Sequence, residues 1–321
     1  MWKVSNSRND AILRIFEDGI TIPLWWALLI AKASQRSVVD VVSDDFRALK
    51  AALSLRIKKV TLSSVCDQFV ALPEAVIRDA CEAYVAQNAA TRAGISPVYV
   101  RQHDLVTEIF SKFLYEEGFG SESVWQHLRP EPFSRSIFHA NFRNENKHVP
   151  ACPYCDLDSV NAVSNRSIEH FLPRSKFPLL AMNALNMIPS CYACNMSWEG
   201  KGTRVIGAAA SPLVRNIGEY VDFSFKFSQK SIGISARNRD PSIQGYLDLV
   251  NLAPRYAGEQ VFSDVNSAGE ALFETFFGGD FDDEMAIAYV VRVRAGAPLT
   301  RVLSAYVRQI CIYFRRDEEA P

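Results

Sequence analysis

The sequence predicts a mostly helical α+β protein, and three observations support that fold class. Apolar residues recur at helical spacing through most of the N-terminal third of the chain. Apolar and polar residues alternate between Val221 and Ile234, as they do in paired strands with one buried face. Two Cys-x-x-Cys pairs between residues 152 and 194 mark a compact module in the middle of the chain. With 321 residues and a hydrophobic content of 48%, the chain can bury a sizeable core.

The N-terminal region, residues 1–95, is expected to consist of helices. Its most hydrophobic run, Ile20–Ala31, is shorter than the roughly 20 residues that cross a bilayer, so it is interpreted as a buried helix. Pro23 suits the first turn of that helix, and the adjacent Trp25 and Trp26 are expected in the core. A tryptophan pair that meets a membrane surface or a partner is the alternative interpretation.

Helical spacing continues over residues 44–87, with a break at residues 72–74. Residues 88–97 are rich in Ala, Thr, Gly and Ser, which indicates a loop and places a domain boundary near residue 95. The second domain, residues 96–205, should begin with an amphipathic helix that ends near Gly118.

The third domain, residues 206–321, is expected to mix strands and helices. A linker at residues 207–212 leads to the alternating segment, which predicts a hairpin. Helical spacing then recurs to the end of the chain, with a break near Gly296 and Pro298. The expected elements are strands at 221–227 and 232–234 and helices at 241–249, 271–277 and 284–316.

The two Cys-x-x-Cys pairs can hold one metal ion. Thiols two residues apart reach the same ion from a tight turn, and a second pair completes a tetrahedron around Zn²⁺. The sequence therefore predicts a structural zinc site, with iron as the alternative metal. A closed knuckle that only stabilises the chain or docks a partner is the simpler interpretation of the same pattern. The four predicted ligands are Cys152, Cys155, Cys191 and Cys194.

The other three cysteines have apolar neighbours and are expected to be buried thiols in a reducing compartment. They are Cys66, Cys81 and Cys311. No apolar core of a signal peptide follows Met1, so a cytoplasmic protein with no membrane partner is expected.

Polar residues with catalytic potential lie between and just after the cysteine pairs. Glu169 and His170 come first, Asn186 precedes the second pair by five residues, and Asn195 follows its last thiol directly. In this order they resemble the zinc-stabilised branch of the HNH endonucleases, the ββα-metal (His-Me finger) family, over about fifty residues. The resemblance implies a central ββα module braced by the zinc site, with helical N-terminal and mixed C-terminal flanks.

The resemblance also implies the local structure of that module. A short strand should end at Glu169 and His170 and open into a loop, which lets the two side chains share one site. Met187 and Ile188 should form the return strand, and residues 192–198 the first turns of the helix. Two positions depart from the family pattern. The acidic residue is Glu where Asp is commoner, and Trp198 stands where a lysine is frequent, with Lys201 further on.

Phosphodiester hydrolysis gives each residue of the resemblance a role. His170 is expected to activate the attacking water, because an imidazole titrates near neutral pH. Glu169 and Asn195 are expected to hold Mg²⁺ or another divalent cation through oxygen atoms. Asn186 is expected to hold the loop so that the histidine keeps its orientation. The implied activity is a metal-dependent endonuclease that cuts one DNA strand at a time.

The net charge of −1 excludes a global basic field, so any DNA footprint must be local. The basic and aromatic stretch at residues 129–147 is the best local candidate, although core phenylalanines with surface arginines explain it as well.

There are two alternative functions. One is a ribonuclease with the same centre, and the other is a non-catalytic zinc module that binds nucleic acid or protein. The family resemblance extends to bacterial anti-phage and mobile-element nucleases, some of which act beside an ATPase encoded next to them. A partner ATPase or another defence protein is therefore implied.

Overall fold

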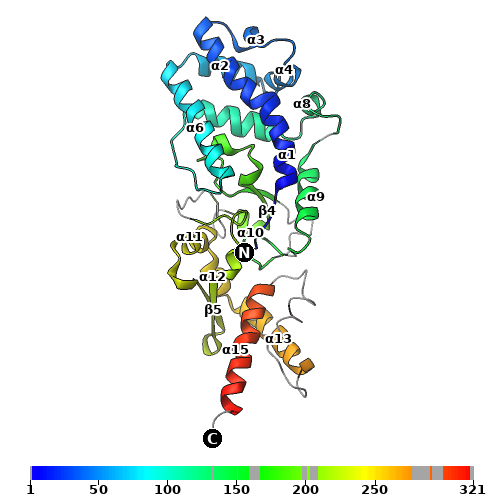
Figure 1. Ribbon diagram of the computed structural model, residues 1–321, viewed down its shortest axis with the longest axis vertical. Helices are drawn as coiled ribbons and strands as arrows, with labels where there is room; N and C mark the ends of the chain where they lie inside the picture. The colour runs from blue at the N-terminus through cyan, green and yellow to red at the C-terminus, as the bar shows by residue number, and fades with distance from the viewer. Residues whose placement is uncertain are drawn as a thin grey trace. The chain divides into compact units, whose positions relative to one another are not determined.

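The computed structural model describes residues 2–131, 133–149, 151–158, 167–196, 201–202, 209–276, 290 and 299–318 (Figure 1). These residues confirm a mostly helical α+β protein with small sheets. The chain divides into two compact units. The helical unit consists of Ser5–Glu145 and Ile168–Ile188, and the cysteine unit consists of Met1–Val4, Asn146–Ser167 and Pro189–Pro321.

The helical unit is built mainly from the predicted N-terminal helices. Its first three elements, α1, η1 and α2, follow one another without interruption and are among the blue helices of Figure 1. A small antiparallel sheet pairs β1 (Arg56–Ile57) with β2 (Val60–Thr61). The helices are α1 (Ser7–Phe16), η1 (Glu17–Thr21), α2 (Ile22–Ser34), α3 (Val38–Val41), α4 (Arg47–Leu53), α5 (Leu62–Val70), α6 (Glu74–Arg92), α7 (Asp104–Thr107), η2 (Glu108–Gly118), α8 (Glu122–Trp125), α9 (Arg135–Glu145), η4 (Pro178–Leu180) and η5 (Ala184–Asn186).

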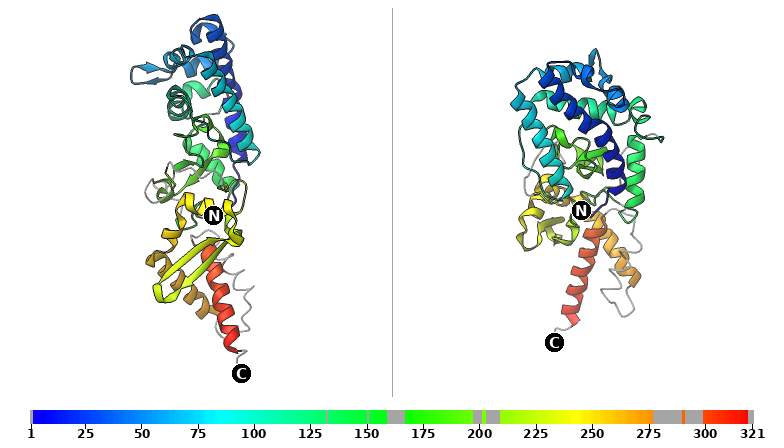
Figure 2. Two further views of the ribbon diagram at one scale, coloured as in Figure 1. Left: turned by 90° about the vertical axis from the view of Figure 1, so that its left-hand side faces the viewer. Right: turned by 45° about the horizontal axis from the view of Figure 1, so that its top comes forward.

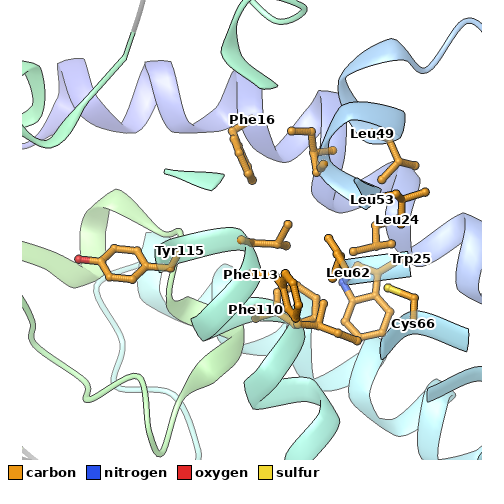
Figure 3. Packing of buried hydrophobic residues seen from close by; sticks show 14 of the residues in the cluster. Phe16, Leu24, Trp25, Leu49, Leu53, Leu62, Cys66, Phe110, Phe113 and Tyr115 are labelled. Carbon is orange, nitrogen blue, oxygen red and sulfur yellow. The ribbon is translucent and has the colours of Figure 1, made fainter. Parts of the chain in front are cut away.

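Trp25 lies at the centre of the helical unit's core, shown in Figure 3. Its ring stacks on Phe110 at 5.2 Å and meets the edge of Phe69 at 6.5 Å. Trp26 is instead 64% exposed, so the expectation that both tryptophans are buried was wrong for the second one. Successive residues of an α-helix, at 3.6 residues per turn, point about 100° apart, and α2 can bury one of the two rings.

Helix α6 is longer than the sequence indicated. The predicted loop at residues 88–97 was wrong for its first five residues, which continue the helix to Arg92. Asn88 lies inside the unit, where its side-chain carbonyl accepts from the Asn183 amide at 2.8 Å, and tertiary contacts of this kind outweigh a weak local helix propensity. The helix stops before Gly94, whose φ of 71° lies in the left-handed region that glycine tolerates.

Other expectations for this unit have mixed outcomes. The predicted helix ending near Gly118 is confirmed as α7 followed by the π-helical η2. Cys66 is fully buried, as expected, and burial raises the pKa of its thiol. Cys81 is only partly buried, so its predicted burial was wrong, because it lies at the edge of the inward face of α6. The side chain of Cys311 lies outside the described residues.

A second small sheet pairs β3 (Ser167–His170) with β4 (Met187–Ser190), and the chain passes from one unit to the other within each of these strands. The residues between them, 171–186, are called here the histidine loop. It contains η4 and η5 and belongs to the helical unit.

The cysteine unit contains the predicted hairpin and helix. Strands β5 (Val221–Lys226) and β6 (Ser231–Ala236) pair in antiparallel register, and α15 lies along the hairpin (Figure 2), with Tyr306 against Phe225 at 5.1 Å. Asp240 accepts hydrogen bonds from the backbone at the start of α11, which confirms the helix predicted at 241–249. The other elements are α10 (Tyr192–Asn195), η6 (Ile217–Glu219), η7 (Phe227–Gln229), η8 (Arg237–Arg239), α11 (Pro241–Val250), α12 (Leu252–Tyr256), α13 (Glu259–Phe276) and α15 (Thr300–Glu318).

Two predicted helices of this unit differ in their bounds. Helix α13 begins at Glu259, twelve residues before the predicted start, because Phe262 and Val265 already give it a buried face. Helix α15 begins at Thr300, and the part of the prediction before residue 299, apart from residue 290, lies outside the described residues. Of the predicted linker at 207–212, residues 209–212 are described and form no helix or strand. Among the helices that the structure describes, none has the length and hydrophobicity needed to cross a membrane.

The two tryptophans of α2 give a direct test of this core. We expect Trp25→Ala to lower the free energy of unfolding by about 3–5 kcal/mol, because it removes a large buried ring. The matched variant Trp26→Ala should change it by less than about 0.5 kcal/mol, because that ring is largely solvated. Urea unfolding followed by circular dichroism measures both values. Equal destabilisation by the two variants would contradict the orientation of α2.

Candidate functional site

The four predicted metal ligands come together in the cysteine unit. Their sulfur atoms are buried and all lie within 4.8 Å of one another. The Sγ atoms of Cys152 and Cys194 are 3.8 Å apart, and so are those of Cys155 and Cys191. Four sulfur atoms bound to Zn²⁺ at about 2.3 Å in a tetrahedron lie about 3.8 Å from one another. The cluster can therefore hold a zinc ion.

Local backbone hydrogen bonds shape both halves of the cluster. The turn of the first pair is closed by the Asp156 amide, which donates to the Cys152 carbonyl at 3.0 Å. The Leu157 amide donates to the Cys155 sulfur and the Cys191 amide to the Cys152 sulfur, each at 3.3 Å. Helix α10 starts directly after Cys191. Such N–H···S contacts stabilise thiolates and orient them toward one point.

Helices α11 and α12 surround the cluster with residues that the spacing of the cysteines does not predict. Tyr256 donates to the carbonyl of Cys155 at 2.7 Å, and Tyr246 donates to the carbonyl of Tyr154 at 2.6 Å. Arg255 places Nη1 3.0 Å from the sulfur of Cys194. In the sequence, the helical spacing over residues 241–249 marks Tyr246 only as a helix residue, and no metal-ligand spacing marks Arg255 or Tyr256.

Arg255 also supplies the charge that this cluster requires. Four thiolates around Zn²⁺ leave a net charge of −2, which is unfavourable in a buried site without a nearby cation. Burial acts to raise the pKa of Cys155, but hydrogen bonds with the other three cysteines and the charge of Arg255 hold that pKa well below its usual range. Burial likewise acts to lower the pKa of Arg255, and the neighbouring thiolates of Cys194 and Cys155 raise it. The guanidinium therefore stays charged beside the sulfur atoms.

In the helical unit, His170 lies at the end of β3 and is held by the histidine loop. The imidazole is only 4% exposed, and its Nε2 lies 2.9 Å from the carbonyl oxygen of Ala181. A carbonyl oxygen can only accept, so Nε2 must carry the hydrogen of this bond. In the neutral imidazole the lone pair that can accept a proton is then on Nδ1. Glu169 precedes it on the strand and is 8% exposed.

Asn186 ties the two ends of the histidine loop together. Its side-chain carbonyl accepts from the Leu172 amide at 2.7 Å, and its amide group donates back to the Leu172 carbonyl at 3.0 Å. The backbone adds a bond from the Phe171 amide to the Asn186 carbonyl at 2.8 Å. The side chain is 1% exposed, so these bonds are shielded from water. They fix the strand end that carries His170 against the segment that carries Ala181.

Two further asparagines anchor the same loop to helices of its own unit. The Asn183 amide donates to the Asn88 side chain of α6 at 2.8 Å. The Asn6 amide, just before α1, donates to the carbonyls of Ala184 at 2.7 Å and Met187 at 2.9 Å. Asn183, Asn88 and Asn6 are all buried. Removing one partner of any of these bonds would leave a buried polar group unsatisfied. The position of the Ala181 carbonyl is therefore determined by helices far away in the sequence.

Tyr115 of η2 is a neighbour of His170 that the sequence does not predict. The two rings meet edge to face with centroids 4.6 Å apart. The guanidinium carbons of Arg135 and Arg174 each lie 5.2 Å from the Tyr115 ring centroid. Burial raises the pKa of the Tyr115 phenol, the two arginine charges oppose that rise, and the carboxylate of Glu169 adds to it. Tyr115 occupies an ordinary apolar position of a helical pattern, so periodicity marks it only as a core residue.

The remaining predicted site residues lie in the cysteine unit. Asn195 is the last residue of α10 and is partly buried. Glu169, His170 and Asn186 belong to the helical unit, so neither unit by itself contains the whole predicted group. Lys201 is 1% exposed and its Nζ donates to the Gly202 carbonyl at 3.0 Å. Trp198 lies outside the described residues. Within the described part of the chain, the cysteines form the one cluster of His, Cys, Asp or Glu placed to share an ion.

Comparison with known proteins gives two short matches. The chain is 39% identical over 44 residues to the Septu protein PtuB of Bacillus thuringiensis, which covers 14% of this chain and 17% of that protein. It is 35% identical over 51 residues to protein ea31 of Escherichia phage lambda, 16% of each chain. The chain thus matches less than a fifth of the length of these curated relatives. No protein-family profile and no solved structure matches it.

Zinc analysis tests the cysteine cluster. We expect one zinc ion per chain in the purified protein and less than about half of that in Cys152→Ser, because a hydroxyl is a poor ligand for this soft site. Cys81→Ser is the matched control, since that thiol lies outside the cluster, and it should keep its zinc. Inductively coupled plasma mass spectrometry measures the metal content. Full zinc content in Cys152→Ser, or iron in place of zinc, would contradict the assignment.

Proposed function

We propose that the protein is a metal-dependent endonuclease that hydrolyses DNA phosphodiester bonds one strand at a time. The proposed centre is a ββα module of β3, the histidine loop, β4 and α10, with the cysteine cluster as its zinc-bound brace. The observation that carries the proposal is the bond between His170 Nε2 and the Ala181 carbonyl. It fixes the tautomer of a buried histidine and leaves the proton-accepting lone pair on Nδ1, as general-base catalysis requires.

His170 is the proposed base. Hydrolysis requires that a water lose a proton as it attacks phosphorus, and a neutral imidazole accepts a proton near physiological pH. The Ala181 carbonyl stabilises the imidazolium that results, because Nε2–H donates more strongly once the ring is charged. The rings and loop around His170 hold its orientation, so little reorganisation is needed when the proton moves.

Glu169 is the proposed ligand of a catalytic Mg²⁺ or similar divalent cation. A carboxylate oxygen suits a hard cation, and the bound ion would stabilise the charge that grows on the leaving 3′ oxygen. Asn195 is the second proposed ligand, on the basis of the family resemblance alone. Because Cys194 directly precedes it, zinc bound at the cluster would also restrain the backbone that carries Asn195.

A role in defence against phage is the proposed biological context. It is supported by the match to a Septu protein, a component of a bacterial anti-phage system, over 44 residues. A partner ATPase or another protein of the same defence system belongs to this proposal. Such a partner would also explain how a chain with a net charge of −1 is brought to DNA.

Replacement of His170 tests the proposed chemistry. We expect the zinc-loaded protein with Mg²⁺ to nick supercoiled plasmid, and His170→Ala to reduce the rate by at least about 100-fold through loss of the general base. His127→Ala is the control, since it removes an exposed imidazole elsewhere in the helical unit and should leave the rate unchanged. Gel electrophoresis of the plasmid forms measures the rates. Equal zinc contents show that the cysteine unit is folded, and equal circular dichroism spectra and urea unfolding curves show that the helical unit is folded.

Three outcomes would contradict the proposal in different ways. An active His170→Ala would remove the proposed base. Cleavage of labelled RNA but not of labelled DNA would make the protein a ribonuclease. No cleavage of either substrate by the zinc-loaded wild type with Mg²⁺ and Mn²⁺ would favour a non-catalytic zinc module.

A further inference from the structure

Tyr115 joins the proposed base to two arginines within the helical unit. Its ring lies 4.6 Å from the His170 ring and 5.2 Å from the guanidinium carbons of Arg135 and Arg174. Figure 3 shows Tyr115 apart from the aromatic rings around Trp25, with its hydroxyl directed away from them. The side chain is 6% exposed, so it is a rigid platform rather than a surface group. The guanidinium carbon of each arginine therefore lies about 10 Å or less from the centroid of the His170 imidazole.

The two arginines differ in what else they contact. Arg174 forms an ion pair with Glu116 and also donates to the Ser111 carbonyl at 3.3 Å, so its charge is already matched. Arg135, at the start of α9, is exposed, and it forms no ion pair among the residues that the structure describes. A guanidinium has five N–H donors, so an interaction of Arg135 with the Tyr115 hydroxyl leaves others for a ligand on its exposed side. Arg135 is therefore the cation of this group that can still bind an anion.

We propose that Arg135 binds a backbone phosphate of the nucleic acid beside the centre at His170, with Tyr115 as the platform that holds both side chains. This inference rests on the proposed nuclease function. The planar guanidinium donates two parallel hydrogen bonds to a phosphate, which fixes orientation as well as charge. A separation of about 10 Å corresponds to about three nucleotides at a rise of 3.4 Å each, so both side chains can reach one short segment of a strand.

In this arrangement Arg174 has a positioning role. Its bonds to Glu116 and Ser111 join the histidine loop to η2, and the Ser111 hydroxyl returns a bond to the Arg174 carbonyl at 3.3 Å. The loop that orients His170 and the helix that carries Tyr115 are therefore held together. Of the two arginines, only Arg135 would contact the substrate.

The test compares Arg135 with a second exposed arginine on the same helix. Arg143 lies eight residues further along α9, about 12 Å away along the axis at 1.5 Å per residue, and carries the same charge. We expect Arg135→Ala to raise KM for plasmid nicking about 10-fold with kcat within about twofold, because one phosphate contact is lost from binding. Arg143→Ala should leave both parameters unchanged, and Arg135→Lys should restore part of the affinity.

A binding measurement separates this inference from the nuclease proposal. In the His170→Ala background, fluorescence anisotropy of a short fluorescein-labelled DNA strand should show about 10-fold weaker binding after Arg135→Ala. The slope of log affinity against log salt should also fall by about one unit, and neither change should follow Arg143→Ala. Equal losses for both arginines, or none for Arg135, would overturn the phosphate contact even if nicking depends on His170. An Arg135-specific loss in a protein that cuts nothing would support the contact and reject the nuclease.

Discussion

The hydrogen bond from His170 to the Ala181 carbonyl is the constraint on which the functional account depends. A histidine without a fixed partner exchanges its proton between two nitrogens and rotates, so it serves poorly as a directed base. Here a carbonyl oxygen fixes both the tautomer and the ring plane. Most other features of the helical unit near this point, including the bonds of Asn186, Asn183 and Asn6, maintain the position of that one carbonyl.

The cysteine unit addresses a separate physical problem, which is the burial of negative charge. Four thiolates and one Zn²⁺ leave two negative charges in a site whose sulfur atoms are buried. Arg255 contacts the sulfur of Cys194, and the hydroxyls of Tyr246 and Tyr256 donate to carbonyls of the first Cys-x-x-Cys turn. The surroundings of the cysteine cluster are thus built from α11 and α12 as much as from the Cys-x-x-Cys turns. A metal site of this kind couples folding of the whole unit to metal binding.

The sequence could predict what local patterns determine. The β5–β6 hairpin follows from alternation, the start of α11 follows from Asp240 and Pro241, and the cysteine cluster follows from spacing. The orientation of Trp26 and the full length of α6 could not be read in this way, because tertiary contacts decide them. The site shows the same division. Residue types and order single out His170 and Asn186, whereas Tyr115 and the Ala181 carbonyl carry no signal in the chain.

The most direct test of the central claim is the tautomer of His170. A long-range ¹H–¹⁵N correlation spectrum of the protein labelled at histidine nitrogens distinguishes protonated from unprotonated ring nitrogens, and His170→Gln assigns the signals. We predict that the neutral ring carries its hydrogen on Nε2 and that Nδ1 is unprotonated. A neutral ring with its hydrogen on Nδ1 would contradict the bond to Ala181 and with it the proposed base.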